Sequence, residues 1–443
     1  MAMSLGFHII FAVVGIGMPL MMVIAEWRWL RTDDQIYLTL AKRWAKGTTI
    51  LFAVGAVTGT VLSFQLGLLW PGFMAWAGPI IGPAFALEAF AFFTEAIFLG
   101  VYLYGWRLLA PAAHLSSGIV VALSGIASAV FVVLANGWMH TPRGFRLVGG
   151  QPIDIDPLAA MLNPSGLMQV PHMVFAAYAA TGFVVAGISA FMLLRDPADR
   201  FHQRAFTIAL VVGGLSALLQ PLSGDLLAKT VADYQPAKLA ALEGQFTTQS
   251  GAPLRLGGIP DIEQGVLRYA IEIPYALSFL LHLDPHATVM GLNSVPRDQW
   301  PPVVVVRQAF QIMILAGSAM AFMALWGGIL WWRGGSVLRS RLFLKMMVLA
   351  TPLGFLATEA GWTATEVGRQ PWIIVGVMRT AEAVTPMPGL VVPLVFFGLL
   401  YLALAAIVIW VLVHHVAASS AETPGQQNDR DELKRQKNGE TTR

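Results

Sequence analysis

Long apolar stretches separated by short polar segments dominate this chain. Each stretch is long enough to cross the roughly 30 Å of hydrocarbon in a bilayer as a helix. The pattern therefore predicts an all-α, polytopic membrane protein. Nine spans are expected, at residues 1–25, 48–70, 84–106, 117–138, 170–194, 205–226, 303–332, 345–364 and 389–415.

The longer polar segments divide the spans into groups. We expect helices 1–6 in residues 1–226, an external loop at 227–301, helices 7–9 in residues 302–415, and a cytoplasmic disordered tail at 416–443. A connection as long as this loop is usually functional or disordered. Within it, residues 237–246 have helical spacing suited to the membrane surface, which favours an ordered, functional loop.

Composition agrees with the apolar pattern. The chain has 443 residues, of which 56% are hydrophobic and 12% charged, and its mean hydropathy is +0.66. The net charge of +3 comes from basic residues near helix ends and indicates no nucleic-acid partner. With no cysteine in the chain, disulfides, thiolate-bound clusters and a covalently attached c-type haem are excluded. His, Met or carboxylate groups would have to hold any metal.

The positions of the basic residues predict the orientation, because lysines and arginines near helix ends remain in the cytoplasm. We expect a bacterial inner-membrane protein with a periplasmic N-terminus and a cytoplasmic C-terminus. No small-residue cleavage site follows the first span, so no cleaved signal peptide is expected. The basic residues follow the first, fifth and seventh spans: Arg28, Arg31, Lys42, Arg43, Lys46, Arg195, Arg200, Arg204, Arg333, Arg339, Arg341 and Lys345.

Two histidines lie in the outer halves of different spans. A single intramembrane histidine is more often a hydrogen-bonded packing residue than a ligand. The pair His8 and His172 favours ligation, because haem is commonly held between the helices of a bundle. Met313 lies at a depth similar to that of His172, and a His and Met pair is a normal axial set for an electron-transfer haem.

Two glutamates lie in the third span. Glu88 and Glu95 are seven residues apart, so on a helix they share one face about 10 Å apart along the axis. Carboxylates in hydrocarbon suit proton relay or metal ligation. They could instead be protonated acids that bond neighbouring helices. Asn136, at the outer end of the fourth span, adds a buried amide or a belt residue.

The segment Gly361–Trp372 combines charge and aromatic rings where the chain leaves the bilayer. Glu366 offers an anionic ligand and Arg369 a cation for anionic groups, while Trp362 and Trp372 offer aromatic walls. Charged residues at such a position are expensive unless they have a use. This combination suits a bound cofactor.

Together these motifs resemble subunit I of the cytochrome bd-type quinol oxidases, over residues 5 to about 415. GRQPW at the end of the set is highly specific, and the short external loop is similar to that of the cyanide-insensitive branch. The motifs on which the resemblance rests are Phe7–His8, Leu87–Glu88 with Glu95, Asn136–Met139, Pro171–His172, Gly258–Asp261, Ile273–Leu277, Phe310–Met313 and Gly368–Trp372.

The resemblance implies three haems. His172 and Met313 match the axial ligands of a low-spin haem b. His8 and Glu366 match the ligands of two high-spin haems, one of type b and the other of type d or a second b, where O2 is reduced to water. Glu88 matches an acid at that site.

The resemblance also assigns surrounding roles. Glu95 matches a second acid on the proton path, Asn136 a polar lining residue, and Trp362 an aromatic between haems. Arg369 resembles a cation facing haem propionates, and Trp372 would pack around a porphyrin.

The external loop is the expected site of quinol oxidation, with Glu272 and nearby Arg268 in the binding region. Quinol oxidation outside and proton uptake inside would generate a proton motive force without pumping. The family implies a second membrane subunit and allows a small single-helix subunit. Many relatives have arginine where Gln311 stands, so a less oxidising low-spin haem is expected.

Two other classes of protein remain open from the residues alone. A proton-coupled secondary transporter would also place glutamates and broken helices in the membrane. A non-catalytic membrane scaffold is the second alternative, although it explains neither the carboxylates nor His8.

Overall fold

The computed structural model describes residues 1–412, so the predicted tail at 416–443 lies outside the described part. Within residues 1–412, nine helical segments are long and apolar enough to cross a membrane, which confirms the predicted fold class. They are α1 Ala2–Thr32, α2 Gln35–Leu69, α3 Pro71–Tyr104, α4 Pro111–His140, α6 Pro164–Arg195, α7 Arg200–Tyr234, α10 Val303–Trp332, α11 Arg341–Ala350 with α12 Leu353–Val367, and α14 Val391–Val411.

Several helices extend beyond their predicted apolar cores. Helix α2 begins at Gln35 rather than at residue 48, because the Asp34 side chain caps it by accepting a hydrogen bond from Ile36 N at 3.1 Å. Helix α7 runs on to Tyr234, past the predicted end at residue 226. Hydropathy marks the segment in hydrocarbon, whereas capping decides where the helix starts.

The eighth span consists of two helices. Helix α11 ends at Ala350 and α12 begins at Leu353, with Pro352 between them. A proline cannot donate the hydrogen bond that a continuous helix needs at this position. Helix α11 packs on α6, and α12 packs on α6 and α10. The break therefore separates α12 from α11 and lets it run on its own toward the end of the bundle that carries β7.

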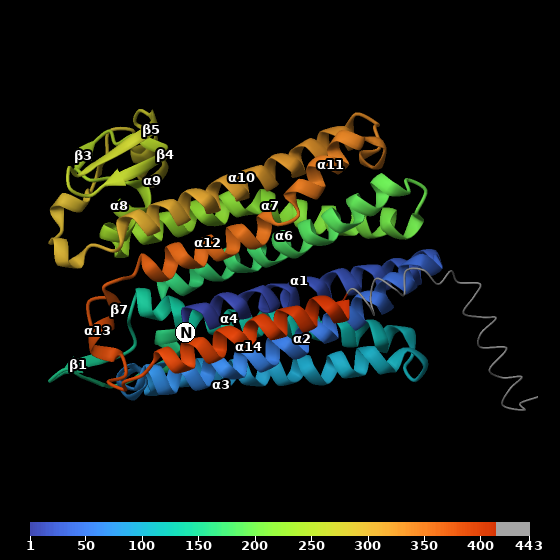
Figure 1. The fold of residues 1–443 in the computed structure, drawn as a ribbon, viewed down its shortest axis with the longest axis horizontal. Coiled ribbons are helices and arrows are strands. Elements are labelled where there is room, and N and C mark those ends of the chain that lie inside the picture. The colour runs from blue at the N-terminus through green and yellow to red at the C-terminus, as the bar shows by residue number, and fades with distance from the viewer. Residues whose placement is uncertain (413–443) are drawn as a thin grey trace, which may run out of the picture.

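The helices pack mainly as sequential antiparallel pairs (Figure 1). Helices α6 and α7 cross closely because Gly182 and Gly213 face each other: a Cβ at Gly182 would lie 2.5 Å from Gly213 Cα. Helices α1 and α2 pair with each other, as do α3 and α4, and α14 packs against α1 and α2. At the contact between α6 and α7, the absence of side chains on the two glycines permits the close approach of the helices.

The segment between α7 and α10 folds over one end of the bundle, and we call residues 236–299 the cap (Figure 1). Two antiparallel strand pairings lie within the cap, β3 with β6 and β4 with β5, and β7 Trp372–Ile374 pairs with β8 Met378–Arg379 outside it. The cap contains α8 Pro236–Glu243, β3 Gln249–Ser250, β4 Leu254–Asp261, β5 Val266–Ile273, α9 Ala276–His282, β6 Thr288–Val289, η2 Leu292–Ser294 and η3 Arg297–Gln299.

Helix α8 lies inside the protein, so the expectation that residues 237–246 lie on a membrane surface is wrong. All residues from Lys238 to Glu243 are buried. Leu239 and Leu242 belong to an apolar cluster with Val306 of α10, which covers the helix. Packing under the cap buries the polar side chains of this helix together with its apolar ones.

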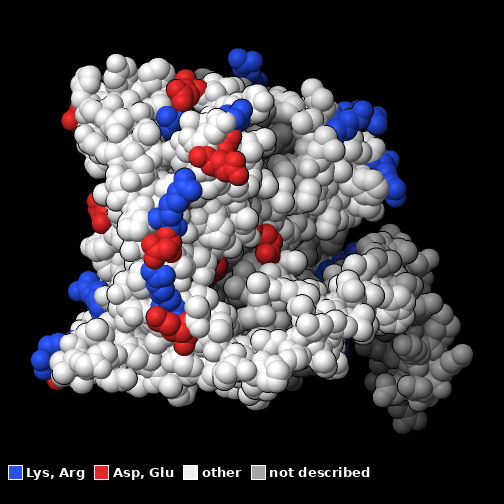
Figure 2. All heavy atoms as spheres, turned by 60° about the vertical axis from the view of Figure 1, so that its left-hand side comes forward, with Lys and Arg blue, Asp and Glu red and all other residues white. Residues whose placement is uncertain are grey.

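Short elements complete both ends of the bundle. Figure 2 looks toward the end that carries the cap and shows acidic and basic side chains lying close together on a surface that is otherwise mostly uncharged. The remaining elements are η1 Gly105–Arg107, β1 Arg146–Val148, β2 Gln151–Ile153, α5 Pro157–Met161, η4 Val337–Arg339, β7 Trp372–Ile374, β8 Met378–Arg379 and α13 Thr380–Ala383; β1 pairs with β2.

A buried arginine fastens the cap to α10. Arg307 is fully buried and donates to Leu242 O at 2.8 Å, to Arg255 O at 2.5 Å and to Gly257 O at 2.7 Å. One helical turn on, Gln311 Oε1 accepts a hydrogen bond from Gly257 N at 2.8 Å. Gly257 has φ +68°, a conformation that favours glycine. Because side chains of α10 satisfy these backbone groups, the cap and the start of α10 form one unit.

Candidate functional site

Glu366 lies at the centre of a polar cluster near the C-terminal end of α12. Its Oε1 accepts a hydrogen bond from Asn136 Nδ2 of α4 at 2.6 Å, and its Oε2 accepts one from Arg369 Nη2 at 2.6 Å. Arg369 is only 6% exposed and lies 3.5 Å from His140 Nε2. The structure therefore brings together three of the residues singled out in the sequence.

Several polar atoms around this cluster are buried without a hydrogen-bond partner among the described residues. They are Asn136 Oδ1, Arg369 Nε and Trp362 Nε1. Leaving such atoms unsatisfied costs roughly 1–3 kcal/mol each. A ligand with its own polar groups would remove this cost, and the propionates of a haem are suitable acceptors for an arginine and an indole N–H. The residues present fit a bound haem.

His8 on α1 is oriented for metal ligation. Thr58 of α2 donates its hydroxyl hydrogen to Val54 O at 2.9 Å, so at the 3.0 Å contact with Thr58 Oγ1 the His8 Nδ1–H is the donor. In this tautomer the Nε2 atom keeps its lone pair. Fixing one ring nitrogen in this way is typical of histidines that bind metals.

His172 on α6 is also oriented by a hydrogen bond at its Nδ1 atom, which lies 3.0 Å from Ser223 Oγ of α7. Ser223 in turn donates to Gln220 O at 3.1 Å. Met313 lies on α10, and Gly361 of α12 leaves space beside it: a Cβ at Gly361 would lie 3.0 Å from Met313 Sδ. The two candidate axial ligands thus come from helices α6 and α10, both of which pack on α7 and α12.

Glu88 and Glu95 both face α4. Glu88 Oε1 accepts a hydrogen bond from Ser128 Oγ at 3.1 Å. Glu95 is buried, and a Cβ at Gly125 would lie 3.3 Å from its Oε1. The two carboxyl groups therefore share one helix face, and Ser128 and Gly125 line the surface opposite. This arrangement can pass protons along the α3–α4 contact.

Trp372 has surroundings separate from those of Glu366. It begins β7, and the Arg379 guanidinium of β8 lies 5.4 Å from its ring centroid. Trp362, in contrast, lies on α12 and packs against the apolar cluster that contains Ile9 of α1. The two tryptophans of the motif therefore face different parts of the molecule.

The proposed quinol residues lie on β5 of the cap but do not contact each other. Arg268 donates to Asp261 Oδ2 at 2.9 Å. Glu272 instead accepts from Arg255 Nε of β4 at 2.8 Å, and Arg255 also bonds Gln245. Arg255 is the basic partner that sequence reasoning missed. It stands opposite Glu272 in the β4–β5 register, which was not recognised in the sequence.

Three further ionisable groups near the site were not singled out in the sequence. Lys238 of α8 is buried and donates to Thr365 O at 3.1 Å. Burial lowers the pKa of Lys238 to about 7, against the effect of Glu366, which raises it, while Arg369 lowers it further. His140 is buried and lies 3.0 Å from Gln235 Oε1. The sequence signal that could have identified Lys238 was the position of a lysine within an otherwise apolar run.

Glu359 is the third of these groups. It lies seven residues before Glu366 and therefore on the same face of α12. Its Oε1 is buried with no hydrogen-bond partner in the described part of the chain. A Cβ at Gly6 of α1 would lie 3.2 Å from its Oε2, so this carboxyl faces the helix that carries His8.

A hollow of about 410 Å³ opens near the cluster at the same end as the cap. Its lining includes His140, Arg143 and Tyr234, and His140 in turn contacts Arg369. The buried cluster is therefore one residue away from an open surface, which a small molecule in solution could reach.

Comparisons with known proteins agree along almost the whole chain. Residues 1–420 match the family model described as cytochrome bd terminal oxidase subunit I. The structure is similar to that of the bd oxidase from Geobacillus thermodenitrificans, with a TM-score of 0.88 and 41% sequence identity, covering 93% of this chain and 95% of that one.

Two proteins of Bacillus subtilis are also similar. One, provisionally named cytochrome bd menaquinol oxidase subunit I, is 38% identical over 420 residues, which are 93% of this chain and 94% of that protein. The other, cytochrome bd ubiquinol oxidase subunit 1, is 33% identical over 425 residues, which are 93% of this chain and 90% of that protein.

Proposed function

Because the chain belongs to the cytochrome bd terminal oxidase subunit I family and is a subunit of a quinol oxidase, we propose a specific division of labour among its residues. Quinol is oxidised at the end that carries the cap, which is the periplasmic side. Its electrons pass by way of a low-spin haem b to two high-spin haems, where O2 is reduced to water. Membership of an enzyme family argues against the transporter and scaffold alternatives.

The low-spin haem b would be held by His172 and Met313, and the high-spin haems by His8 and Glu366, with Glu88 beside them. When bound, the haems supply the electron transfer and the reduction of O2. The hydrogen bonds that orient the two histidine rings, from Nδ1 of His8 to Thr58 and between Nδ1 of His172 and Ser223, support these assignments. Whether the second high-spin haem is of type d or type b is decided by absorbance.

Protons for water would reach the site along α3. Glu95 is the deeper carboxyl and Glu88 the nearer one to the outer end, where Ser128 holds it by a hydrogen bond of 3.1 Å. A quinol releases its protons as it gives up electrons. Release outside together with uptake from inside generates a proton motive force without a conformational pump.

Quinol binding would use the charged face of the cap, where Glu272 and Arg268 lie on one strand. Arg255 holds Glu272 in place at 2.8 Å, and Asp261 holds Arg268. Both pairs leave exposed polar atoms on the strand surface. We propose that this surface binds the polar ring of the quinol, while its apolar tail extends toward the bilayer.

The subunit would work beside a second membrane subunit, and a small single-helix subunit could join them. Large apolar side chains on α2 and α3 are exposed to the surroundings of this chain, among them Phe64, Phe90, Phe93 and Ile97. Either lipid or a partner helix can cover such a surface.

One observation carries the haem assignments: Glu366 is fixed by Asn136 and Arg369 while Asn136 Oδ1, Arg369 Nε and Trp362 Nε1 have no partners among the described residues. The test is an absorption spectrum of the purified oxidase with and without dithionite. A Soret band that shifts on reduction is expected, and its absence would refute haem binding.

Ligand variants test the low-spin pair. Replacing His172 or Met313 by Leu should abolish the low-spin haem signal and leave the high-spin signals. Met320→Leu is the matched control, since Met320 is a buried methionine on the same helix. Persistence of the low-spin signal in both ligand variants would rule out this pair.

A further inference from the structure

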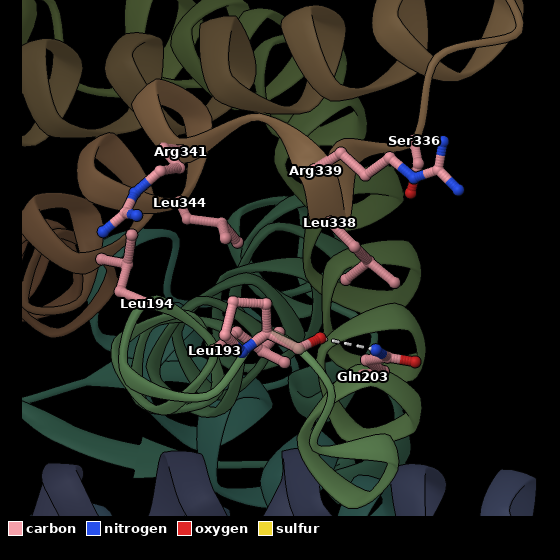
Figure 3. A pocket seen from close by; sticks show the side chains of 9 residues that line it. Leu193, Leu194, Gln203, Ser336, Leu338, Arg339, Arg341 and Leu344 are labelled. Atoms are coloured by element: carbon pink, nitrogen blue, oxygen red, sulfur yellow. Dashed lines mark hydrogen bonds between the residues drawn. The ribbon is translucent and has the colours of Figure 1, made fainter.

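A cavity of about 550 Å³ lies at the end of the bundle opposite the cap, where α6 ends and α7 and α11 begin. Its floor is apolar and includes Leu193, Leu338 and Leu344, and two arginines, Arg339 and Arg341, stand at its edge. Figure 3 shows the arginines on opposite sides of the cavity with the leucines between them. None of these residues belongs to the proposed oxidase site.

The two arginines carry charge that the rest of the described chain does not neutralise. Within residues 1–412, neither Arg339 nor Arg341 makes an ion pair or a side-chain hydrogen bond, and both are exposed. In the cap, by comparison, Arg268 pairs with Asp261 at 2.8 Å. At the same end as the cavity, Arg204 lies 3.4 Å from Asp34. The cavity therefore combines an apolar floor with unpaired positive charge.

The cavity lies at the level where hydrocarbon meets water. Trp331 and Trp332 end α10 and are 73% and 88% exposed, as expected of aromatic side chains in an interfacial belt. On α11, which follows the cavity, Leu342 and Leu349 are 62% and 67% exposed and face outward. A molecule in this cavity would meet the polar boundary on one side and lipid chains on the other.

We propose that this cavity binds an anionic phospholipid, with its headgroup at the positively charged edge that Arg339 and Arg341 provide and an acyl chain lying over the leucine floor. Guanidinium groups bind phosphate through paired, charge-assisted hydrogen bonds. Basic pockets between membrane helices are known to select anionic headgroups. The leucine floor favours a lipid over a free anion, which would leave that apolar surface unused. The proposal is independent of the haem assignments.

Because the chain contains no cysteine, a single introduced thiol can report on the cavity. Leu338→Cys, in the purified oxidase with its second subunit, is treated with a maleimide, and modification of this chain is followed by mass spectrometry. Phosphatidylglycerol in detergent should slow the modification, whereas phosphatidylcholine should not. Ser336→Cys, at the rim, replaces Leu338→Cys if that variant does not assemble.

Arginine variants connect the protection to charge. Arg339→Gln and Arg341→Gln should each raise the phosphatidylglycerol concentration needed for half protection about fivefold, and about 25-fold together, the effect expected for basic residues near an anionic headgroup. Arg31→Gln is the matched control: Arg31 is exposed at the same end but lies on α1 against Trp27, and protection should be unchanged.

Four results would overturn the proposal. Equal protection by phosphatidylcholine would show an apolar crevice without headgroup selection. Protection by inorganic phosphate at the same concentration would show a free-anion site. Unchanged protection in the double arginine variant would exclude the phosphate contact. Slow modification without lipid that becomes fast when residues 413–443 are deleted would show that the chain's own C-terminal segment fills the cavity.

Discussion

Gln311 lies where the cap meets α10, the helix that carries Met313. The charge at this position leads to a prediction for the midpoint potential of the low-spin haem. Gln311→Arg places a positive charge two residues from the proposed axial ligand. Positive charge favours the reduced haem, so its midpoint potential should rise. Redox titration of the low-spin haem measures the change.

Gln311→Leu is the control for that experiment. It also removes the hydrogen bond that Gln311 accepts from Gly257 N, but it adds no charge. A rise of the same size in both variants would mean that the lost contact with the cap, rather than charge, sets the potential. No rise in the arginine variant would contradict the electrostatic explanation.

Glu243 gives a pH-dependent prediction outside the membrane spans. Burial raises its pKa from 4.5 to about 7, although Arg307 and Arg255 lower it. The folded state therefore holds this proton more tightly than the unfolded state, and stability contributed by the protonated group is lost as the pH rises from about 4.5 through about 7. Glu243→Gln should raise the melting temperature relative to wild type more at pH 8 than at pH 5.

Glu272→Gln serves as the matched control for the melting experiment, because Glu272 is a cap glutamate that is 54% exposed and paired with Arg255. Its effect on the melting temperature should be small at both pH values. An equal difference between wild type and Glu243→Gln at pH 5 and pH 8 would show that Glu243 does not titrate in this interval.

Local sequence singled out some residues of the polar cluster around Glu366, and long-range packing brings the others to it. Glu366 and Arg369 are three residues apart, so their pairing at the end of a helix follows from spacing. Lys238 and His140 reach the same cluster from α8 and α4, and no spacing in the sequence relates them to Glu366. The partner of Glu272 was missed because it depends on strand register.

At the scale of elements, the β4–β5 hairpin depends on a glycine. Gly258 has φ +90°, and a Cβ there would lie 2.7 Å from Leu267 Cγ on β5. Gly258→Ala should therefore destabilise the cap by about 1–3 kcal/mol, the usual cost of such backbone strain. Faster limited proteolysis within the cap should accompany the lower melting temperature.

Gly317→Ala provides the comparison on α10. A Cβ at Gly317 has nothing within 4 Å, and the residue lies in an ordinary helix, so the substitution should be neutral or stabilising by up to about 1 kcal/mol. Equal proteolysis of the cap in the two alanine variants would mean that Gly258 is not needed for its backbone conformation.

The membrane-spanning helices were predicted well, their ends less well, and the strands of the cap were not predicted. All nine spans were found because each carries a long apolar segment, which is a strong local signal. The ends of α2 and α7 were missed because polar residues continue both helices past the hydrocarbon. The burial of α8 was missed because an apolar run cannot show whether lipid or protein will cover it.

At the scale of the whole molecule, the orientation in the membrane can be tested directly. Gln264 is exposed at the tip of the β4–β5 hairpin, and Thr32 is exposed at the opposite end of the bundle. In cells with a permeable outer envelope, a membrane-impermeant maleimide should modify Gln264→Cys. Thr32→Cys should react only after the membrane is broken. The reverse pattern would place the cap in the cytoplasm.

The attachment of the cap to α10 has a consequence for electron transfer. Arg307 and Gln311 hold cap backbone within the first turns of the helix that carries Met313. A quinol bound to the cap and a haem bound to Met313 would therefore be attached to the same structural unit, the cap together with the start of α10. The tunnelling distance between them would stay constant when the bilayer thins or stretches, so the rate of this transfer should be insensitive to membrane tension.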